Sequence, residues 1–494
     1  MDVLKEFRNF SPHPAFSRKG RWKERHFLNI KIPSPLAGEG RVRGGLICSG
    51  VVFGKVLFKL GLLRHQRRLF GGIPRNDRKE KMKKNNIQIS PANRTALLIA
   101  PLLALQWPIL HLIYPQLSLP WVPLLPGVAI FASAYLLSWA AEVAEVDIPP
   151  ALALGILSLA AVAPEYAVDI YFAWHGGQDP SYIPFAVANM TGGNRLLIGM
   201  GWAMIVLFYA WKTRKTEVVL EKRLNLETAV LLAATLYSFL IPLKGTLSLL
   251  DTAVFFALFL FYFSRLLKSG AHEPQVEGPV AAIQRWPKIP RRIFVLGFFF
   301  IAAWTIYAAS QPFAEGLLTL GRHWGIEEFI LVQWLAPIAS ESPEFLVAIL
   351  FALKAKPTAS FNTIISSTVN QWTLLVGALP LAYTLARGGL HSMVMDSRQI
   401  EEVFLTSAQS LFGVVILSNL RFSFKEAGLL FFLFITQALY PLVEPWVGIP
   451  SVYVRNVYAF LYLGAALGIL ISSKRLRQDL MGFTRVFLDP TQKK

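Results

Sequence analysis

Long apolar runs separated by short polar loops make up the chain from residue 94 onward. About twelve such runs of about 17–28 residues are present, each long enough to cross a bilayer as a tilted helix. Because lipid offers no hydrogen-bond partners, a spanning segment must satisfy its own backbone groups and is therefore helical. We predict an all-α polytopic membrane protein whose solvent is the lipid bilayer. The runs are centred near Ala104, Ala134, Ala161, Leu197, Thr235, Leu258, Ala302, Pro337, Thr373, Leu411, Phe434 and Leu463.

Composition agrees with this class and weakens a role in nucleic-acid binding. The mean hydropathy is +0.46 and 54% of the residues are hydrophobic. Residues 1–93 hold 21 Lys/Arg against 6 Asp/Glu, which accounts for +15 of the formal net charge of +19. We expect this basic extension to be disordered and predict no nucleic-acid partner. Met82, followed by Lys83-Lys84, would make a conventional start, in which case residues 1–81 would not be translated.

Charge in the loops predicts the orientation of the chain. Lys and Arg gather after the fourth, sixth, eighth, tenth and last runs, which share one side of the membrane with the basic N-terminus if the runs alternate. By the positive-inside rule, both termini are predicted to be cytoplasmic. We expect a multi-pass protein of the plasma (inner) membrane, with the loop at 176–181 outside and the loop at 354–358 inside.

Two of the apolar runs contain a carboxylate directly after a proline, at Pro164-Glu165 and Pro343-Glu344. A charge at mid-bilayer costs roughly 2.5–3.5 kcal/mol, and a proline in a helix interior about 3 kcal/mol. A bound cation would offset both penalties, because it is attracted to the carboxylate and to backbone carbonyls freed by the proline. Helical spacing pairs Asp169 with Glu165 and Glu341 with Glu344, and one member of a close carboxylate pair tends to keep a proton.

The second helix of each motif is rich in amides and hydroxyls. The first copy resumes after a polar loop as Ala188-Asn189-Met190-Thr191-Gly192-Gly193-Asn194, and the second as Ser366-Ser367-Thr368-Val369-Asn370-Gln371. The copies lie five runs apart, so an odd number of crossings gives the two halves opposite orientations. We predict an inverted 5+5 repeat core, as in many secondary transporters, with one extra helix at each end.

This pairing of a Pro-Glu helix with an amide-bearing helix, once in each half, resembles the two alpha-repeats of the sodium/calcium exchanger family. The resemblance covers the chain from about Pro126 to about Pro445, and it implies a mid-membrane ion cluster and exchange of Ca2+ for H+ or Na+. The expected organisation is an extension at 1–93, an extra helix at 94–117, a first repeat at 121–268 (alpha-1 at 150–211), a cytoplasmic linker at 269–292, a second repeat at 293–446 (alpha-2 at 327–385), an extra helix at 450–473 and a cytoplasmic tail at 474–494.

The resemblance also implies a set of ion ligands. Its two central carboxylates fall on Glu165 and Glu344, and its amide-bearing elements on the second helix of each repeat. The first repeat lacks the hydroxyls that the family places before its glutamate, and Arg195 sets a fixed positive charge beside Asn194. Both departures favour protons over sodium as the coupling ion. The predicted set is Glu165, Asp169, Asn189, Asn194, Ser340, Glu341, Glu344, Ser367, Asn370 and Gln371.

Structural alternatives exist for several of these residues. Asp169 could pair with Arg195, the asparagines could be ordinary interhelical hydrogen-bond partners, and Gly192-Gly193 could serve close helix packing. No nucleotide-loop, zinc-helix or nucleophile-elbow motif occurs, so we predict a transporter and not an enzyme, with no cofactor beyond the transported cations. The alternative functions are a monovalent Na+/H+ exchanger, a cation channel or a non-transporting membrane scaffold.

Overall fold

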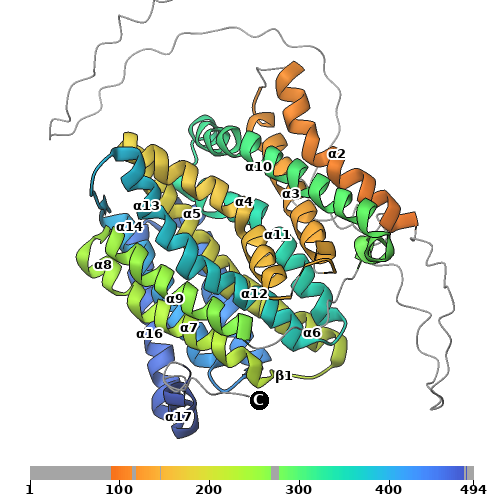
Figure 1. The fold of residues 1–494 in the computed structure, drawn as a ribbon. Coiled ribbons are helices and arrows are strands. Elements are labelled where there is room, and N and C mark those ends of the chain that lie inside the picture. Colours follow the sequence, from red (N-terminus) through yellow and green to blue (C-terminus); the bar gives the residue numbers. More distant parts are fainter. Residues whose placement is uncertain are drawn as a thin grey trace, which may run out of the picture. The chain divides into compact units, whose positions relative to one another are not determined.

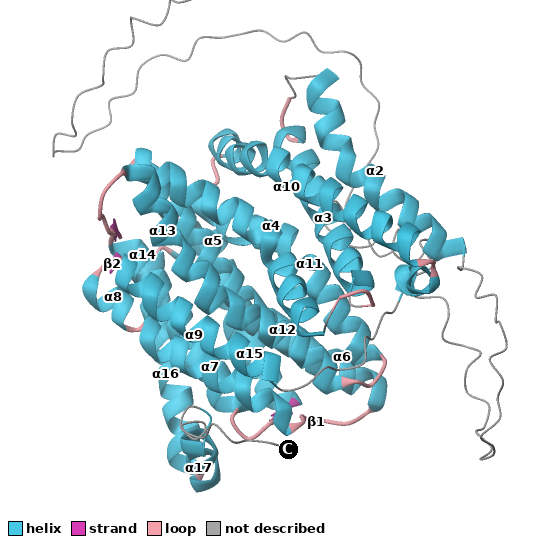
Figure 2. Cartoon of the chain, viewed as in Figure 1, coloured by secondary structure: helices cyan, strands magenta, loops and turns pink. Residues whose placement is uncertain are grey.

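The computed structural model describes residues 91–113, 118–144, 146–148, 150–268, 278–482 and 486. Expectations for residues 1–90, for the linker segment 269–277 and for most of the tail beyond 482 lie outside these described residues. Within them the chain is helical apart from short loops and two small strand pairs, as the sequence predicts (Figure 2).

The elements follow one another with short connections (Figure 1). The helices are α2 (Pro91–Ile113), α3 (Trp121–Ala144), α4 (Pro150–Gln178), η1 (Pro180–Tyr182), α5 (Ile183–Arg195), η2 (Leu196–Trp202), α6 (Ala203–Thr213), η3 (Lys222–Leu224), α7 (Asn225–Ser238), α8 (Leu240–Lys244), α9 (Leu249–Lys268), η4 (Gly278–Arg285), α10 (Lys288–Trp324), α11 (Glu328–Leu353), α12 (Pro357–Asn370), η5 (Gln371–Leu375), α13 (Val376–Arg387), α14 (Ser397–Leu417), α15 (Phe424–Val447), α16 (Ser451–Ser472) and α17 (Lys474–Gly482). The strands are β1 (Glu217–Val219), β2 (Thr246–Leu247), β3 (Met393–Val394) and β4 (Arg421–Ser423).

Nine helical segments of the described residues are long and apolar enough to cross a membrane, or ten if the bent helix α11 counts as one span. Helix α4 and the run from α12 to α13 correspond to the apolar runs near Ala161 and Thr373. They are not among these segments in the described part of the chain. The count of about twelve spans therefore stays a prediction.

Helix ends follow local capping chemistry. The hydroxyl of Ser423 and the carboxylate of Glu426 form a capping box at the start of α15, so two backbone N–H groups of the first turn are satisfied. Asp396 accepts a hydrogen bond from the backbone N–H of Gln399 at the start of α14 (2.8 Å). Helix α10 ends at Gly325 with φ +66°, a left-handed conformation that glycine adopts without strain.

The strands pair crosswise between the two halves of the chain. Strand β1 follows α6 and pairs with β4, which precedes α15, so that Val218 lies opposite Phe422. Strand β2 precedes α9 and pairs with β3, which follows α13. The membrane-crossing segments of each half can be counted from α3 and from α10. On this count, the loop after the third segment of one half pairs with the loop after the fourth segment of the other half. If the halves had the same orientation, the third loops of both halves would lie on one side of the membrane. If the halves are inverted, the third loop of one half lies on the same side as the fourth loop of the other.

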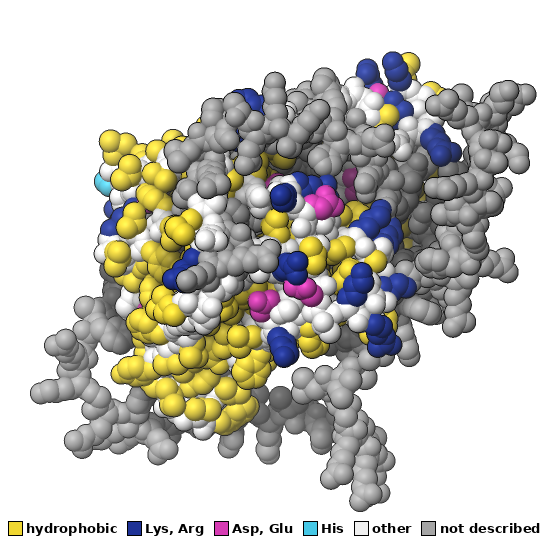
Figure 3. All heavy atoms as spheres, turned by 90° about the horizontal axis from the view of Figure 1, so that it is seen from below, with side chains coloured by type: hydrophobic (Ala, Val, Ile, Leu, Met, Phe, Trp, Pro, Cys, Tyr) yellow, Lys and Arg dark blue, Asp and Glu magenta, His cyan; other side chains and the backbone are white. Residues whose placement is uncertain are grey.

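The β1–β4 pair marks a basic end of the molecule. Arg214 and Lys215 before β1 are exposed, and Arg421 of β4 lies 3.5 Å from the Glu217 carboxylate. Figure 3 views the molecule from below, the side toward which β1 lies in Figure 1, and shows Lys and Arg side chains gathered beside an apolar surface. The loops that contain β1 and β4 follow the fourth and tenth apolar runs, and the charge pattern assigns both to the cytoplasmic side. Their pairing brings them to the same end of the molecule.

Helices of one half pack against helices of the other half in the core. Helix α4 packs against α13 and α11 packs against α5, while α3 and α10 lie side by side. In the same way, α9 packs against η5 and α15 against η2. Trp202 of η2 and Trp372 of η5 are fully buried, and the indole N–H of Trp372 donates to the Ser410 hydroxyl (2.9 Å). This arrangement brings the helices that carry the two Pro-Glu motifs into one core.

Candidate cation site

One amide joins the acidic helices of the two halves. The Nε2 of Gln371 donates to Oε2 of Glu165 on α4 (2.9 Å) and to Oε1 of Glu341 on α11 (2.6 Å). All three side chains are buried, with at most 2% of each residue exposed. Two carboxylates held by a single neutral donor in a low-dielectric core are costly to ionise together without a positive partner.

The other two predicted carboxylates lie near this pair. Glu344 interacts electrostatically with both Glu165 and Glu341, and so does Asp169, which is itself 1% exposed. Glu344 is half-buried, but its Oε2 atom is shielded from solvent. Helix α11 bends by 58° between Ser342 and Glu344, as a proline in a helix interior dictates. The predicted acidic pairs of the two halves therefore meet in one cluster.

Ten buried side-chain oxygens of the predicted set accept no hydrogen bond. They are Oε1 of Glu165, both carboxylate oxygens of Asp169, Oδ1 of Asn189, Oδ1 of Asn194, Oε2 of Glu341, Oε2 of Glu344, Oγ of Ser367, Oδ1 of Asn370 and Oε1 of Gln371. A buried polar atom left unpaired costs about 1–3 kcal/mol, so the whole set is expensive for the fold. Oxygen atoms that accept no hydrogen bond are available as ligands, and a hard cation such as Ca2+ prefers oxygen ligands.

The remaining contacts show how the amides are turned. The Nδ2 of Asn194 donates to the backbone carbonyl of Met190 (2.9 Å), which leaves its oxygen unpaired. Asn189 lies next to Asp169, although neither oxygen of Asp169 is in a well-formed hydrogen bond. The hydroxyl of Ser340 donates along its own helix to the carbonyl of Ala336 (3.1 Å). Ser340 is thus the one predicted residue without an unpaired side-chain oxygen.

Both amide-bearing helices widen directly after their amides. The π-helical segment η2 begins two residues after Asn194, and η5 begins at Gln371 itself. Such widened turns inside a helix frequently mark functional sites, because they redirect side chains that a regular helix would aim elsewhere. Their occurrence at matching places in both halves links the two copies of the motif.

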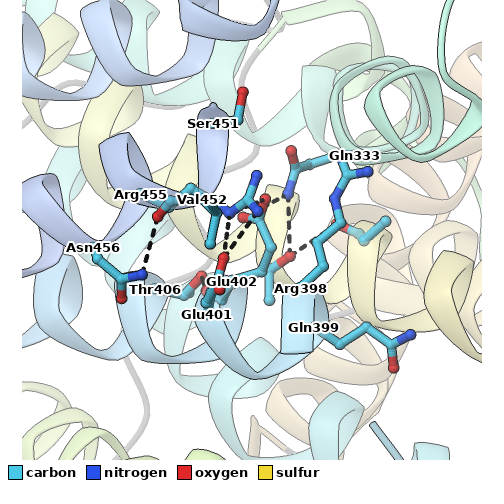
Figure 4. A network of polar contacts seen from close by, with 12 residues as sticks. Gln333, Arg398, Gln399, Glu401, Glu402, Thr406, Ser451, Val452, Arg455 and Asn456 are labelled. Carbon is cyan, nitrogen blue, oxygen red and sulfur yellow. Dashed lines mark hydrogen bonds and ion pairs between the residues drawn. The ribbon is translucent and has the colours of Figure 1, made fainter. Parts of the chain in front are cut away.

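Arg195 does not pair with Asp169, which was the structural alternative for that carboxylate. Its guanidinium instead lies 2.6 Å from the Glu402 carboxylate of α14, in a fully buried ion pair. Glu402 was not among the predicted site residues, nor were Gln333 and Arg455, which contact Glu402 (Figure 4). A signal was present: Glu402 is a carboxylate inside an apolar run, and so needs a buried positive partner.

The described residues hold no ready-made cage of three or more His, Cys, Asp or Glu side chains. A cation at this place would be coordinated by carboxylates together with amide and hydroxyl oxygens. That donor set suits Ca2+, which takes about 6–8 oxygen ligands in flexible geometry. It does not suit softer metals, which prefer sulfur or imidazole.

Comparisons with known proteins identify the family and the fold of the chain. The sodium/calcium exchanger protein family matches residues 120–268 and 294–443. The chain is similar to a crystal structure described as the H+/Ca2+ exchanger CAX, with 41% identity, a TM-score of 0.75, and coverage of 80% of this chain and 98% of that one. It shares its fold with native YfkE, at 16% identity, a TM-score of 0.51, and coverage of 69% and 98%.

A curated relative is the putative antiporter CaxA of Alkalimonas amylolytica, which is 22% identical over 254 residues, or 50% of this chain and 76% of that protein. These matches confirm the predicted resemblance and the expectation of a multi-pass membrane transporter that is not an enzyme. With two family matches that together span more than half of the sequence, the chain belongs to the sodium/calcium exchanger family of membrane cation antiporters.

Proposed function

We propose that this protein is a secondary antiporter that exchanges Ca2+, or a related divalent cation, for H+ or Na+ at the Glu165–Glu344 cluster. The observation that carries the proposal is the set of ten buried, unpaired side-chain oxygens contributed by both halves. Two or more glutamates offer the charge that a divalent ion needs, and Asn194, Asn370 and Gln371 offer neutral oxygens to complete its shell.

Protons are the favoured coupling ion in this proposal. Glu165 and Glu341 are bridged by one Gln371 amide, so they form a close pair of like charges that can share a proton when no cation is present. Entry of a divalent cation would expel that proton and so link the two ions at one site. The likeness to a protein described as an H+/Ca2+ exchanger, at 41% identity, supports the same choice.

Alternating access by inverted repeats is the second part of the proposal. The crosswise pairing of β1 with β4 and of β2 with β3 supports opposite orientations of the halves 121–268 and 293–446. Helices α2 and α16 lie outside these halves, as the extra helices at 94–117 and 450–473. By the positive-inside rule, we propose that the loop at 354–358 and both termini are cytoplasmic and that the loop at 176–181 is outside.

Purified protein in lipid vesicles tests the proposal directly. Uptake of radioactive Ca2+ would be measured under a pH gradient without sodium, and separately under a sodium gradient at constant pH. We expect uptake driven by the pH gradient and abolished by Glu165→Gln. Full uptake on the sodium gradient alone would assign the coupling to sodium, and absence of uptake under both gradients would refute divalent transport.

A further inference from the structure

A buried cluster of charges begins one residue after Asn194, a proposed ligand, and has no part in the coordination proposed above. Arg195 directly follows Asn194 on α5, yet its guanidinium is fully buried and lies 2.6 Å from Glu402 on α14. The Nε of Arg195 turns back to the Thr191 carbonyl of its own helix (3.4 Å). The guanidinium also lies over the Trp334 ring, 5.1 Å from the ring centroid. A positive charge is therefore held on the same helix that supplies the proposed ligands Asn189 and Asn194.

Glu402 makes two further contacts, each with a different helix. Gln333 of α11 donates its amide to Glu402 (3.1 Å) and to the Thr191 hydroxyl of α5 (3.4 Å). Arg455 of α16 lies 3.8 Å from Glu402 and donates to Glu401 (2.9 Å). Figure 4 shows Glu402 between Gln333 and Arg455. The carboxylate is thus positioned by α11 and by α16, a helix that lies outside both repeats.

The packing around these residues fixes α5 firmly. A Cβ atom on Gly192 would overlap the Gln333 carbonyl oxygen, so the backbones of α5 and α11 are in direct contact there. The amide of Gln409 on α14 donates to the carbonyl of Arg195 itself (3.0 Å). These contacts hold the Arg195 backbone between α11 and α14, and the negative charge that offsets the guanidinium is the Glu402 carboxylate.

We infer that Arg195 and Glu402 form an ion pair that sets the affinity of the site for a divalent cation. Glu402, held by Arg455 of α16, offsets the Arg195 charge and leaves the net charge of the site to its own carboxylates. The inference rests on the proposed function. In a low-dielectric core, a unit charge acts over distances at which water would screen it. Loss of either partner would therefore change the affinity for a divalent cation in opposite directions.

The test measures Ca2+ uptake by the full-length protein in vesicles under a fixed pH gradient. The readout is the Ca2+ concentration at which uptake is half-maximal. Glu402→Gln leaves Arg195 uncompensated and is expected to raise the half-saturating concentration roughly tenfold. Arg195→Gln is expected to lower it, and Arg455→Gln to lower it less, because each removes a positive charge. The double variant Arg195→Gln/Glu402→Gln is neutral overall and is expected to return to within about threefold of the wild type.

Arg322→Gln is the matched control, because it removes an arginine charge from an exposed pair with Glu328. It is expected to leave the half-saturating Ca2+ concentration unchanged.

A purely structural role would impair all three single variants alike and would leave the double variant impaired. That pattern, with normal wild-type transport, would overturn this inference alone. Absence of wild-type Ca2+ transport would overturn the proposed function and this inference with it. If a single variant fails to fold, the sign of the Arg455→Gln shift and the recovery in the double variant still decide the question.

Discussion

A Cβ atom on Gly193 of α5 would lie 2.5 Å from Oε1 of Glu341 on α11, so this backbone passes directly against a site carboxylate. The same Cβ would lie 3.2 Å from both amide atoms of Gln371. The glycine therefore does more than allow two helices to approach: it leaves room for the hydrogen bond between Gln371 and Glu341.

Gly193→Ala is expected to reduce Ca2+ transport roughly tenfold to a hundredfold, because the methyl group displaces Glu341 from the amide that orients it. The protein should still fold, since the displaced atom is the far end of a flexible side chain. Gly428→Ala, with no atom within 4 Å of its added Cβ, is the control and should transport normally. Gly192→Ala should instead yield little folded protein, because its Cβ would meet the backbone oxygen of Gln333. Normal transport by Gly193→Ala would contradict the proposed role of Glu341.

Glu165 and Glu344 are both expected to be indispensable. Neighbouring amides cannot replace the charge of a carboxylate toward a divalent ion, so Glu165→Gln or Glu344→Gln should abolish transport while membrane insertion stays normal. Vesicle uptake and size-exclusion chromatography of the same samples would measure both properties. Ser340→Ala is a suitable comparison, because the Ser340 hydroxyl already donates to Ala336. Its effect should be much smaller, and wild-type rates from either glutamine variant would remove the central claim.

Glu341 is expected to govern the response to pH more than the binding of the ion. It sits beside Glu165 as a second negative charge, and a neutral glutamine at this position would end the repulsion that favours protonation of the pair. Glu341→Gln should therefore flatten the dependence of uptake on pH while changing the half-saturating Ca2+ concentration less. Uptake rates measured across a pH series in both proteins would check this. An unchanged pH profile would assign proton coupling to other groups.

An ion pair at one end of the molecule predicts a pH dependence of stability. Arg291 donates to both oxygens of Asp147 (2.7 and 2.8 Å), and these hydrogen bonds hold the pKa of Asp147 below its usual value. A lowered folded-state pKa stabilises the protein above the unfolded pKa of about 3.9, and this stabilisation is lost as the pH falls through the folded value.

Asp147→Asn should therefore lower stability near neutral pH by about 1.5–3 kcal/mol, the typical value of hydrogen bonds to charged groups. The difference from the wild type should shrink as the pH falls below about 4. Thermal unfolding in detergent at several pH values would measure it. A deficit that stays constant down to the lowest pH would show that the carboxylate charge is not the stabilising element.

The two loops at the ends of the acidic helices should react from opposite sides of the membrane. Cys48 is the only cysteine, so a Cys48→Ser protein is a clean background for labelling. Ser181 and Lys356 are exposed in their loops. Ser181→Cys should react with an impermeant thiol reagent from outside, and Lys356→Cys only after the inner face is opened. Labelling of both from one side would rule out inverted repeats.

Much of the candidate site follows from local sequence. An apolar run that contains a proline and a carboxylate carries a penalty wherever it folds, so Pro164-Glu165 and Pro343-Glu344 point to a bound cation without any knowledge of neighbours. Helical spacing then adds Asp169 and Glu341, because residues three or four apart share a face. These are properties of single helices, and the sequence by itself determined them.

Only the tertiary structure decided which helices face one another. That Gln371 bridges Glu165 to Glu341, and that Arg195 pairs with Glu402 in place of Asp169, depends on contacts between elements far apart in the chain. Periodicity tells which face of a helix is apolar or acidic, but it does not tell which partner covers that face. The partners are set by how the whole core packs, because a buried charge such as that of Arg195 is stabilised by an opposite charge that another helix brings to it.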